Sequence, residues 1–160
     1  MSSLSRQFYN LNNTSERQDE RGIVFINANF DNCDTLIQQI VPELRVIVVS
    51  PHAQGIQEVS RILDTSCCQE IYIISQGSPG CLYLGSTELS LNTLINHSSE
   101  LQSWFQNPAD VMLDDRRLYL YGSDVAAGDV GEEFITKLSS IVGATIAASA
   151  KVAKSHVLQP

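Results

Sequence analysis

Two short polar stretches, each directly after an apolar run, contain the residue types best suited to chemistry. The run at 71–74 ends in Ser75-Gln76-Gly77-Ser78-Pro79-Gly80, and the run at 118–121 ends in Gly122-Ser123-Asp124. Such runs are typical of buried parallel strands, and ligands in open α/β sheets bind at the carboxyl ends of the strands. We therefore predict one binding site made of both loops. Its predicted lining residues are Ser75, Gln76, Gly77, Ser78, Gly122, Ser123 and Asp124.

Neither loop has the features of a nucleotide or metal site. The chain contains neither GxGxxG after its first strand nor GxxxxGK[ST], and no Lys or Arg lies in either loop to meet a phosphate charge. The histidines His52, His97 and His156 are scattered, and the acids of 110–115 are expected in a solvated loop. We therefore expect no cofactor and no metal.

The elements that would position the two loops alternate between strand and helix. Apolar runs predict strands at 23–26, 45–50, 71–75, 118–121 and 144–148, and helical periodicity predicts helices at 36–41, 56–63, 90–105 and 129–142. The last helix is expected to start with a capping box, Asp129 with Glu132, and a hairpin with a type II′ turn at Gly85-Ser86 is expected at 82–89.

This alternation predicts a three-layer α/β sandwich with a mainly parallel sheet of about five strands flanked by helices. Right-handed crossovers leave few topologies, of which the flavodoxin-like and the caspase-like are two. We expect a single domain at 22–150, a flexible polar tail at 1–21 and a second tail at 151–160.

Composition limits the partners that the domain can have. The net charge of -8 repels phosphate backbones, so nucleic acid is not an expected partner. No run approaches the length of a membrane span and no secretory signal is evident, so a cytoplasmic location is expected. Cys33, Cys67, Cys68 and Cys81 have no disulfide or zinc spacing, and we expect reduced thiols; the adjacent pair leaves a redox role open.

Both loops also carry a resemblance to a known family. IYIISQGSPGCLYLGSTELSL resembles a strand followed by Ser-His-Gly-Ser and a hairpin, and LYLYGSDVAAGDVGEEFITKLSSIVGATIAAS resembles a strand followed by Tyr-Gly-Cys-Asn, a turn and a helix. Together with IVFINA and VIVVSPHAQGIQEVSRIL, they resemble the bacterial domain of unknown function 4347. That family is itself similar to the caspase, gingipain and separase group of cysteine peptidases, which implies a caspase-like fold.

The resemblance places the general base of these peptidases on Gln76 and the nucleophile on Ser123. Glutamine cannot take up a proton in the working pH range, and a serine hydroxyl needs an effective base before it can attack. The resemblance therefore implies a degenerate dyad with no catalytic residue. We expect an inactive pseudo-peptidase that acts as a protein- or peptide-binding or scaffold module.

Two other interpretations stay open at this point. One is a hydrolase that uses Ser123 or Cys81 with a non-standard base, for which His52 is the only histidine with a suitable position. The other is a flavodoxin-like binder of an anionic ligand at the same strand ends. The family pattern usually continues beyond the fifth strand, and its early end here implies a free sheet edge through which the protein can form homo-oligomers.

Overall fold

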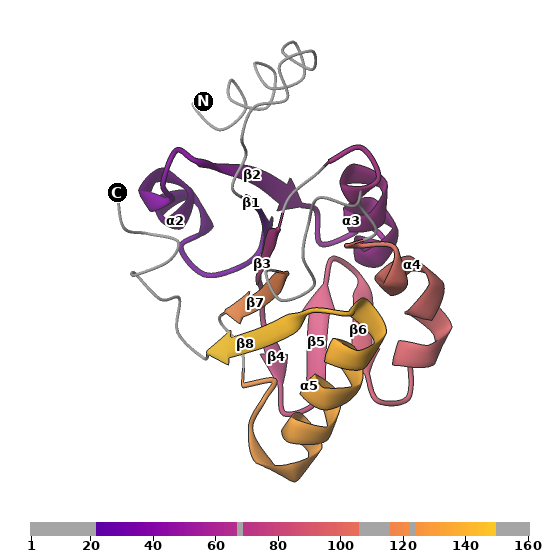
Figure 1. Cartoon of the computed structure of the whole chain (residues 1–160). Helices are drawn as coiled ribbons and strands as arrows, with labels where there is room; N and C mark the ends of the chain where they lie inside the picture. Colours follow the sequence, from indigo (N-terminus) through magenta and orange to yellow (C-terminus); the bar gives the residue numbers. More distant parts are fainter. Residues whose placement is uncertain (1–21, 67–68, 106–115, 122–123, 150–160) are drawn as a thin grey trace.

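The protein is built on one parallel β-sheet, shown in the computed structural model of Figure 1. The structure describes residues 22–66, 69–105, 116–121 and 124–149. The sheet has five strands in the order β2-β1-β3-β7-β8, and each neighbouring pair is parallel. The strands are β1 (Gly22–Asn27), β2 (Leu44–Val49), β3 (Glu70–Ile74), β7 (Arg117–Tyr121) and β8 (Thr145–Ser149). The predicted parallel sheet is confirmed, and its strand order is the doubly wound order of flavodoxin-like folds.

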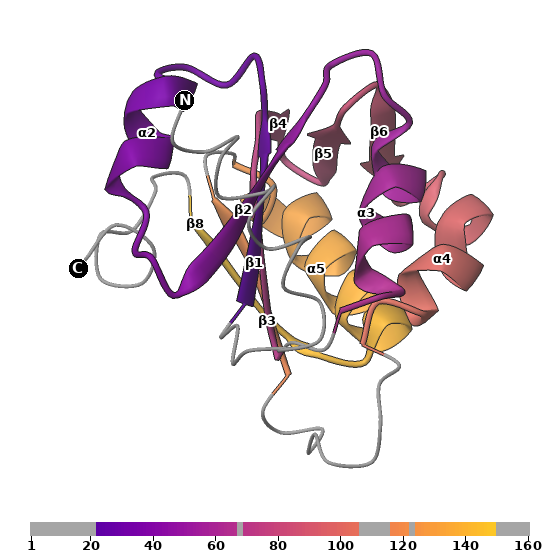
Figure 2. The ribbon, with the colours of Figure 1, turned by 90° about the horizontal axis from the view of Figure 1, so that it is seen from above.

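Helices lie on both faces of this sheet. Figure 2 shows one helix on one side and the others on the opposite side, which makes the predicted three layers. Helix α2 (Cys33–Gln39) lies alone on its side among the described helices. The opposite side carries α3 (Gly55–Leu63), the 3-10 turn η1 (Leu94–His97), α4 (Ser98–Gln102) and α5 (Gly128–Val142). No helix in the described part of the chain is long and apolar enough to cross a membrane.

A small antiparallel sheet covers one end of the second face. It contains β4 (Gly77–Ser78), β5 (Cys81–Leu84) and β6 (Thr87–Ser90). Leu84 pairs with Thr87 across a two-residue loop in which Gly85 has a φ of 62° and Ser86 does not have a positive φ. A positive φ at the first loop position alone is what a type II′ turn requires, so the predicted hairpin is confirmed. Strand β4 lies where the sequence predicts only loop, because two residues are too few to show alternation.

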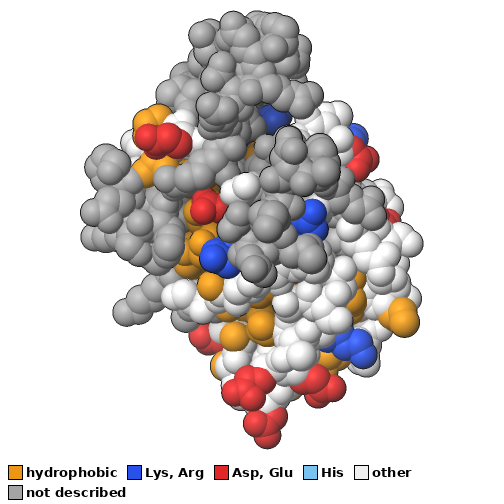
Figure 3. Space-filling model, in the orientation of Figure 1, with side chains coloured by type: hydrophobic (Ala, Val, Ile, Leu, Met, Phe, Trp, Pro, Cys, Tyr) orange, Lys and Arg blue, Asp and Glu red, His pale blue; other side chains and the backbone are white. Residues whose placement is uncertain are grey.

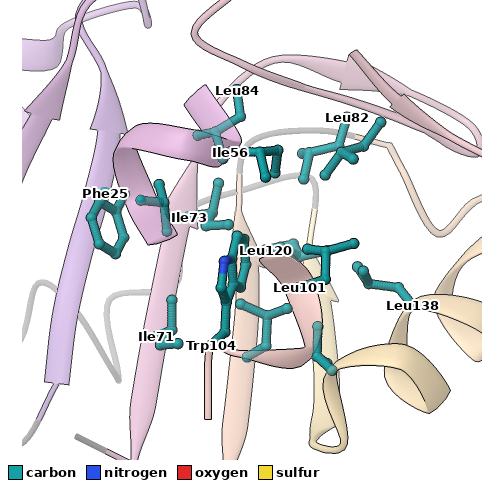
Figure 4. Close-up of a cluster of buried hydrophobic side chains, with 14 of the residues drawn as sticks. Phe25, Ile56, Ile71, Ile73, Leu82, Leu84, Leu101, Trp104, Leu120 and Leu138 are labelled. Carbon is teal, nitrogen blue, oxygen red and sulfur yellow. The ribbon is translucent and has the colours of Figure 1, made fainter. Parts of the chain in front are cut away.

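Alternating strand residues divide the core into two clusters. The larger cluster lies between the sheet and α3, α4 and α5, where leucine and isoleucine side chains from the sheet and these helices interdigitate (Figure 4). Trp104, only 2% exposed, belongs to it and donates an indole N–H to the Ser60 hydroxyl at 2.8 Å. The second cluster, on the α2 face, contains three stacked tyrosines, Tyr72, Tyr119 and Tyr121. Continuous burial of β3 and β7 on both faces explains their unbroken apolar sequences.

Two details differ from the sequence prediction. The expected long helix at 90–105 is instead a strand end, the turn η1 and the five-residue α4. Ser90 is held in the strand because its N–H donates to the Thr93 hydroxyl, and Ser98 returns its hydroxyl to the Ile95 carbonyl, contacts that compete with continuous helix. The capping box is also wrong: α5 begins at Gly128 after an Ala127 cap, so Asp129 lies inside the first turn.

Candidate functional site

The two predicted loops leave the sheet side by side. Strands β3 and β7 are neighbours and run parallel, with Ile74 in register with Tyr121. Gln76 and Ser123 each follow that registered pair by two residues. Gly122 and Ser123 lie outside the described residues, so their side chains are not placed. The strand register nevertheless brings both predicted loops to the same edge of the sheet, as expected from the sequence.

Ser75 is the first residue of the site, and it is completely buried. Its N–H donates to the Tyr121 carbonyl at 3.1 Å, which extends the β3 to β7 pairing by one residue. Its hydroxyl has no hydrogen-bond partner within the part of the chain that the structure describes. Because a buried polar group without a partner is costly, Ser75 is a position where packing alone does not explain the residue type.

Gln76 is held on both its backbone and its side chain. Its side-chain amide donates to the Asn29 carbonyl at 3.1 Å, and its own carbonyl accepts the Tyr83 N–H at 3.2 Å. The first contact joins the loop after β3 to the loop after β1, and the second joins it to the hairpin. Gln76 therefore satisfies backbone groups of two neighbouring segments, and as an amide it has no group that can serve as a base.

The other side of the site is formed by the turn between β4 and β5 and by the start of α5. Gly80 has a φ of 73°, and its N–H donates to the Val125 carbonyl at 2.8 Å. A Cβ atom added to Gly80 would lie 2.9 Å from Val130, so only glycine fits this approach. Ser78 and Asp124, both predicted site residues, are exposed here. A backbone hydrogen bond thus connects the loop after β3 to the loop after β7, and exposed polar side chains lie beside it.

A buried asparagine, Asn27, ends β1 at the crevice between β1 and β3 and bonds to the hairpin. It is 2% exposed; its amide donates to the Tyr83 carbonyl and its carbonyl oxygen accepts the Gly85 N–H, both at 3.1 Å. In doubly wound folds this crevice, where the strand order reverses, is the usual ligand position. Here the hairpin of the chain itself occupies it, which weighs against a flavodoxin-like binder of an anionic ligand.

We expect Asn27→Asp to lower the free energy of unfolding by about 2 to 3 kcal/mol at pH 7, because a buried carboxylate cannot donate to the Tyr83 carbonyl. Burial raises the carboxyl pKa in the folded state, so the lost stability should return as the pH falls and the acid becomes protonated. Urea unfolding at pH 7 and pH 4 measures both. Asn29→Asp, at an exposed position, is the matched control. Equal effects of the two variants would contradict the role assigned to Asn27.

The residues proposed for an alternative hydrolase are poorly placed. The Cys81 thiol contacts the Glu88 carboxylate at 3.2 Å, and partial burial together with that carboxylate raises the pKa of Cys81. A raised pKa disfavours the thiolate that attack requires. His52 is exposed in the turn after β2, and the strand order places β1 between β2 and β3. The end of β2, which His52 follows, therefore lies about two strand spacings, roughly 10 Å, from the end of β3, which precedes Gln76.

Acidic side chains gather at the end of the molecule where α5 begins (Figure 3). The first turns of α5 contain Asp129, Glu132 and Glu133, and the exposed Asp124 precedes them. An open groove of about 670 Å³ runs along the outer face of the helix. All its described lining residues come from α5. Within the described residues no group of three or more potential ligands is suited to a metal ion.

Sequence reasoning missed two residues that shape this site. Asn27 directly follows the strand predicted at 23–26 and Gly55 directly precedes the helix predicted at 56–63, yet both residues hold the hairpin against the sheet and α3. The contacts of Asn27 span 56 and 58 residues of chain. An asparagine at the end of an apolar strand indicates a side-chain hydrogen bond, so Asn27 could have been singled out. The neighbouring sequence does not show which residues are its partners.

The sheet and its connected polar loops define an α/β sandwich domain with a candidate binding edge at the carboxyl ends of β3 and β7. Residues 23–156 match the family described as Domain of unknown function (DUF4347), and the chain belongs to this family. The resemblance seen in the sequence is confirmed at that level. No curated protein matches the chain.

Proposed function

We propose that this domain is a catalytically inactive, caspase-like module that binds a protein or peptide at the carboxyl ends of β3 and β7. The observation that carries the proposal is Gln76. It occupies the position that the resemblance gives to the general base, and its side chain is engaged by the Asn29 carbonyl. A residue that holds two loops together can preserve the shape of a peptidase site without its proton transfer.

The chemistry of the remaining candidates supports inactivity. Cys81 lies beside a carboxylate that raises its pKa, and His52 is separated from the Gln76 loop by β1. A hydrolase based on Ser123 or Cys81 would therefore need a base from elsewhere. The observations favour binding without turnover, with Gln76 and Ser123 as polar residues that line the site.

The partner that suits this edge is a peptide segment without net negative charge. The small polar side chain of Ser78 is available to an extended peptide, and the glycine at position 77 permits close approach. Asp124 and the acids at the start of α5 would repel an acidic segment and attract Lys or Arg side chains. Exclusion of nucleic acid and a cytoplasmic location are part of the same proposal.

Self-association is a further part of the proposal. Among the described strands β8 is the last of the sheet, and its sequence TIAAS contains neither charge nor proline. Natural edge strands are usually protected by such residues against pairing with another chain. A second copy pairing with β8 would extend the sheet without covering the loops after β3 and β7.

Substitution of Ser78 tests the binding role. Peptides selected from a displayed random library against the full chain should lose about tenfold or more in affinity, about 1.4 kcal/mol, for Ser78→Trp, because the indole obstructs the edge. Ser99→Trp, at an exposed position of α4, is the matched control and should bind as the unaltered chain does. Calorimetric titration measures both. Equal affinity for the two variants would place the binding surface elsewhere and contradict the proposal.

A further inference from the structure

The outer face of the hairpin carries an aromatic ring opposite a carboxylate. Leu82, Leu84 and Leu89 are at most 1% exposed and pack into the larger core cluster, so the residues between them point outward. Tyr83 is 42% exposed and is in register with the exposed Glu88. Residues directly opposite each other in an antiparallel pair have Cβ atoms about 5 Å apart. The phenol ring and the carboxylate therefore belong to one open surface.

Tyr83 is held in place by residues of the candidate site. Its N–H donates to the Gln76 carbonyl at 3.2 Å, and its carbonyl accepts the side-chain amide of the buried Asn27 at 3.1 Å. Because both backbone groups are engaged, only the side-chain rotamer remains to be ordered when a ligand binds, which lowers the entropic cost of binding. Tyr83 lies on β5, between β4, which carries Ser78, and β6, which carries Glu88 (Figure 1). The outer face of the hairpin thus continues the proposed binding edge.

Glu88 has a negative charge that no cationic side chain in the described part of the chain neutralises. Its carboxylate accepts a hydrogen bond from the Cys81 thiol at 3.2 Å. The contact with Cys81 and the charge of Glu88 raise the pKa of Tyr83, and partial burial together with Glu88 raises the pKa of Cys81. Both shifts mean that a further negative charge is disfavoured here. The same local field favours a positive charge.

The backbone at the outer edge of β6 is already engaged. The Thr93 hydroxyl donates to the Glu88 carbonyl at 2.9 Å and accepts the Ser90 N–H at 2.8 Å. The Thr93 N–H donates to the Ser90 carbonyl at 3.1 Å. One residue therefore occupies three backbone groups with which an added strand would pair. A partner that reaches β6 can use its side chains, of which only Glu88 is charged.

We propose that Tyr83 and Glu88 form a subsite for the side chain of an arginine in a bound peptide, an inference that rests on the proposed peptide binding beside it. A guanidinium group can stack on the Tyr83 ring while its N–H groups donate to the Glu88 carboxylate. Arginine suits this pair better than lysine does, because its planar group can make both contacts at once. The acids at the start of α5 attract any cation, whereas this subsite selects one side chain.

A matched pair of peptides tests the subsite. Peptides are selected from a displayed random library against the full chain, and their recurring arginine is replaced by citrulline, which has nearly the same shape without the charge. Calorimetric titration should show that this replacement raises the Kd about fivefold or more for the unaltered chain. For Glu88→Gln the same replacement should change the Kd by less than about twofold. Glu43→Gln, an equal loss of charge at an exposed position before β2, is the matched control and should keep the full effect.

A second variant, Tyr83→Leu, retains an apolar side chain without a ring face and should also reduce the effect of citrulline. Trp104 fluorescence verifies that each variant is folded. Selected peptides that lose affinity in Ser78→Trp but contain no recurring arginine would overturn the subsite and leave the proposed binding intact. An equal effect of citrulline in Glu88→Gln and the unaltered chain would overturn it as well. A library that yields no peptide dependent on Ser78 would contradict the proposed binding, and the subsite with it.

Discussion

The double variant Gln76→His with Ser123→Cys should be labelled at residue 123 by a peptide-based, thiol-reactive probe, and the chain as it stands should not. Both positions follow the registered pair Ile74 and Tyr121 by two residues in the sequence, and that pair lies on neighbouring strands about 4.8 Å apart. A histidine and a cysteine on two loops that lie this near each other can form a dyad in which the histidine activates the cysteine. This result would indicate that the site derives from a peptidase whose catalytic residues have since been replaced.

The Asn29 carbonyl makes this expectation sharper. It now accepts a hydrogen bond from the Gln76 side chain. A neutral imidazole at position 76 can donate one N–H to the same carbonyl and keep its other nitrogen free as the base, an orientation that catalytic histidines commonly need. The structure therefore already contains an acceptor that would select the correct tautomer.

Two single variants separate base assistance from simple thiol reactivity. Ser123→Cys alone supplies a thiol without a base, and general-base assistance is worth about 10²- to 10⁴-fold in rate. The double variant should therefore label at least about a hundredfold faster than Ser123→Cys, and Gln76→His alone should not label at this position. Equal labelling rates for Ser123→Cys and the double variant, with unchanged circular dichroism, would show that position 76 is not the base position and remove the caspase-like assignment.

Failure of this experiment and failure of peptide binding have different meanings. If the restored protein is labelled but the unaltered chain binds no peptide, the binding edge has lost its affinity for peptides as well as its dyad. If peptides bind at Ser78 but restoration fails, the edge is a binding surface without peptidase ancestry. The two measurements thus separate the origin of the site from its present use.

The sequence predicted the sheet, and the edge at which β3 and β7 end together, because both depend on local patterns. Apolar runs such as that at Glu70–Ile74 identify buried strands by themselves, and parallel strands bring their carboxyl ends to one edge. Gln76 and Ser123 stand in the loops after two predicted strands, but their roles come from the family resemblance, and only Gln76 lies among the described residues. The contact from Gln76 to Asn29 crosses 47 residues, and no periodicity reveals it.

The errors have a physical pattern as well. The segment at 90–105 has helical spacing of its apolar residues, but Ser and Thr side chains in it bond to nearby backbone groups and shorten the helix. The predicted α5 cap is wrong because the Gly131 N–H donates to the Ala127 carbonyl at 3.1 Å, so the helix begins at Gly128, one residue earlier than Asp129. The spacing of apolar residues therefore predicts where these helices lie, whereas local hydrogen bonds determine where they start and end.

Gly55→Ala should lower the free energy of unfolding by about 3 kcal/mol or more, the largest stability effect expected in this chain. A Cβ atom at Gly55 would lie 1.9 Å from the Leu84 carbonyl oxygen and 2.4 Å from its carbon. Both are backbone atoms of the hairpin, so no side-chain rotation relieves the overlap, and α3 and β5 would have to separate. That separation would also break the Ser86 N–H contact to the Ala53 carbonyl, 2.8 Å long.

Urea unfolding followed by Trp104, the only tryptophan of the chain, measures this loss. Gln57→Ala, at an exposed position of the same helix, introduces the same side chain and should change stability by no more than about 0.5 kcal/mol. A Gly55→Ala variant as stable as this control would mean that the hairpin is not held against α3. Since the hairpin also carries the Tyr83 N–H that binds the Gln76 carbonyl, amide exchange at Tyr83 should accelerate in Gly55→Ala. Faster exchange of the Tyr83 amide would show that the packing of Gly55 helps to keep the binding edge ordered.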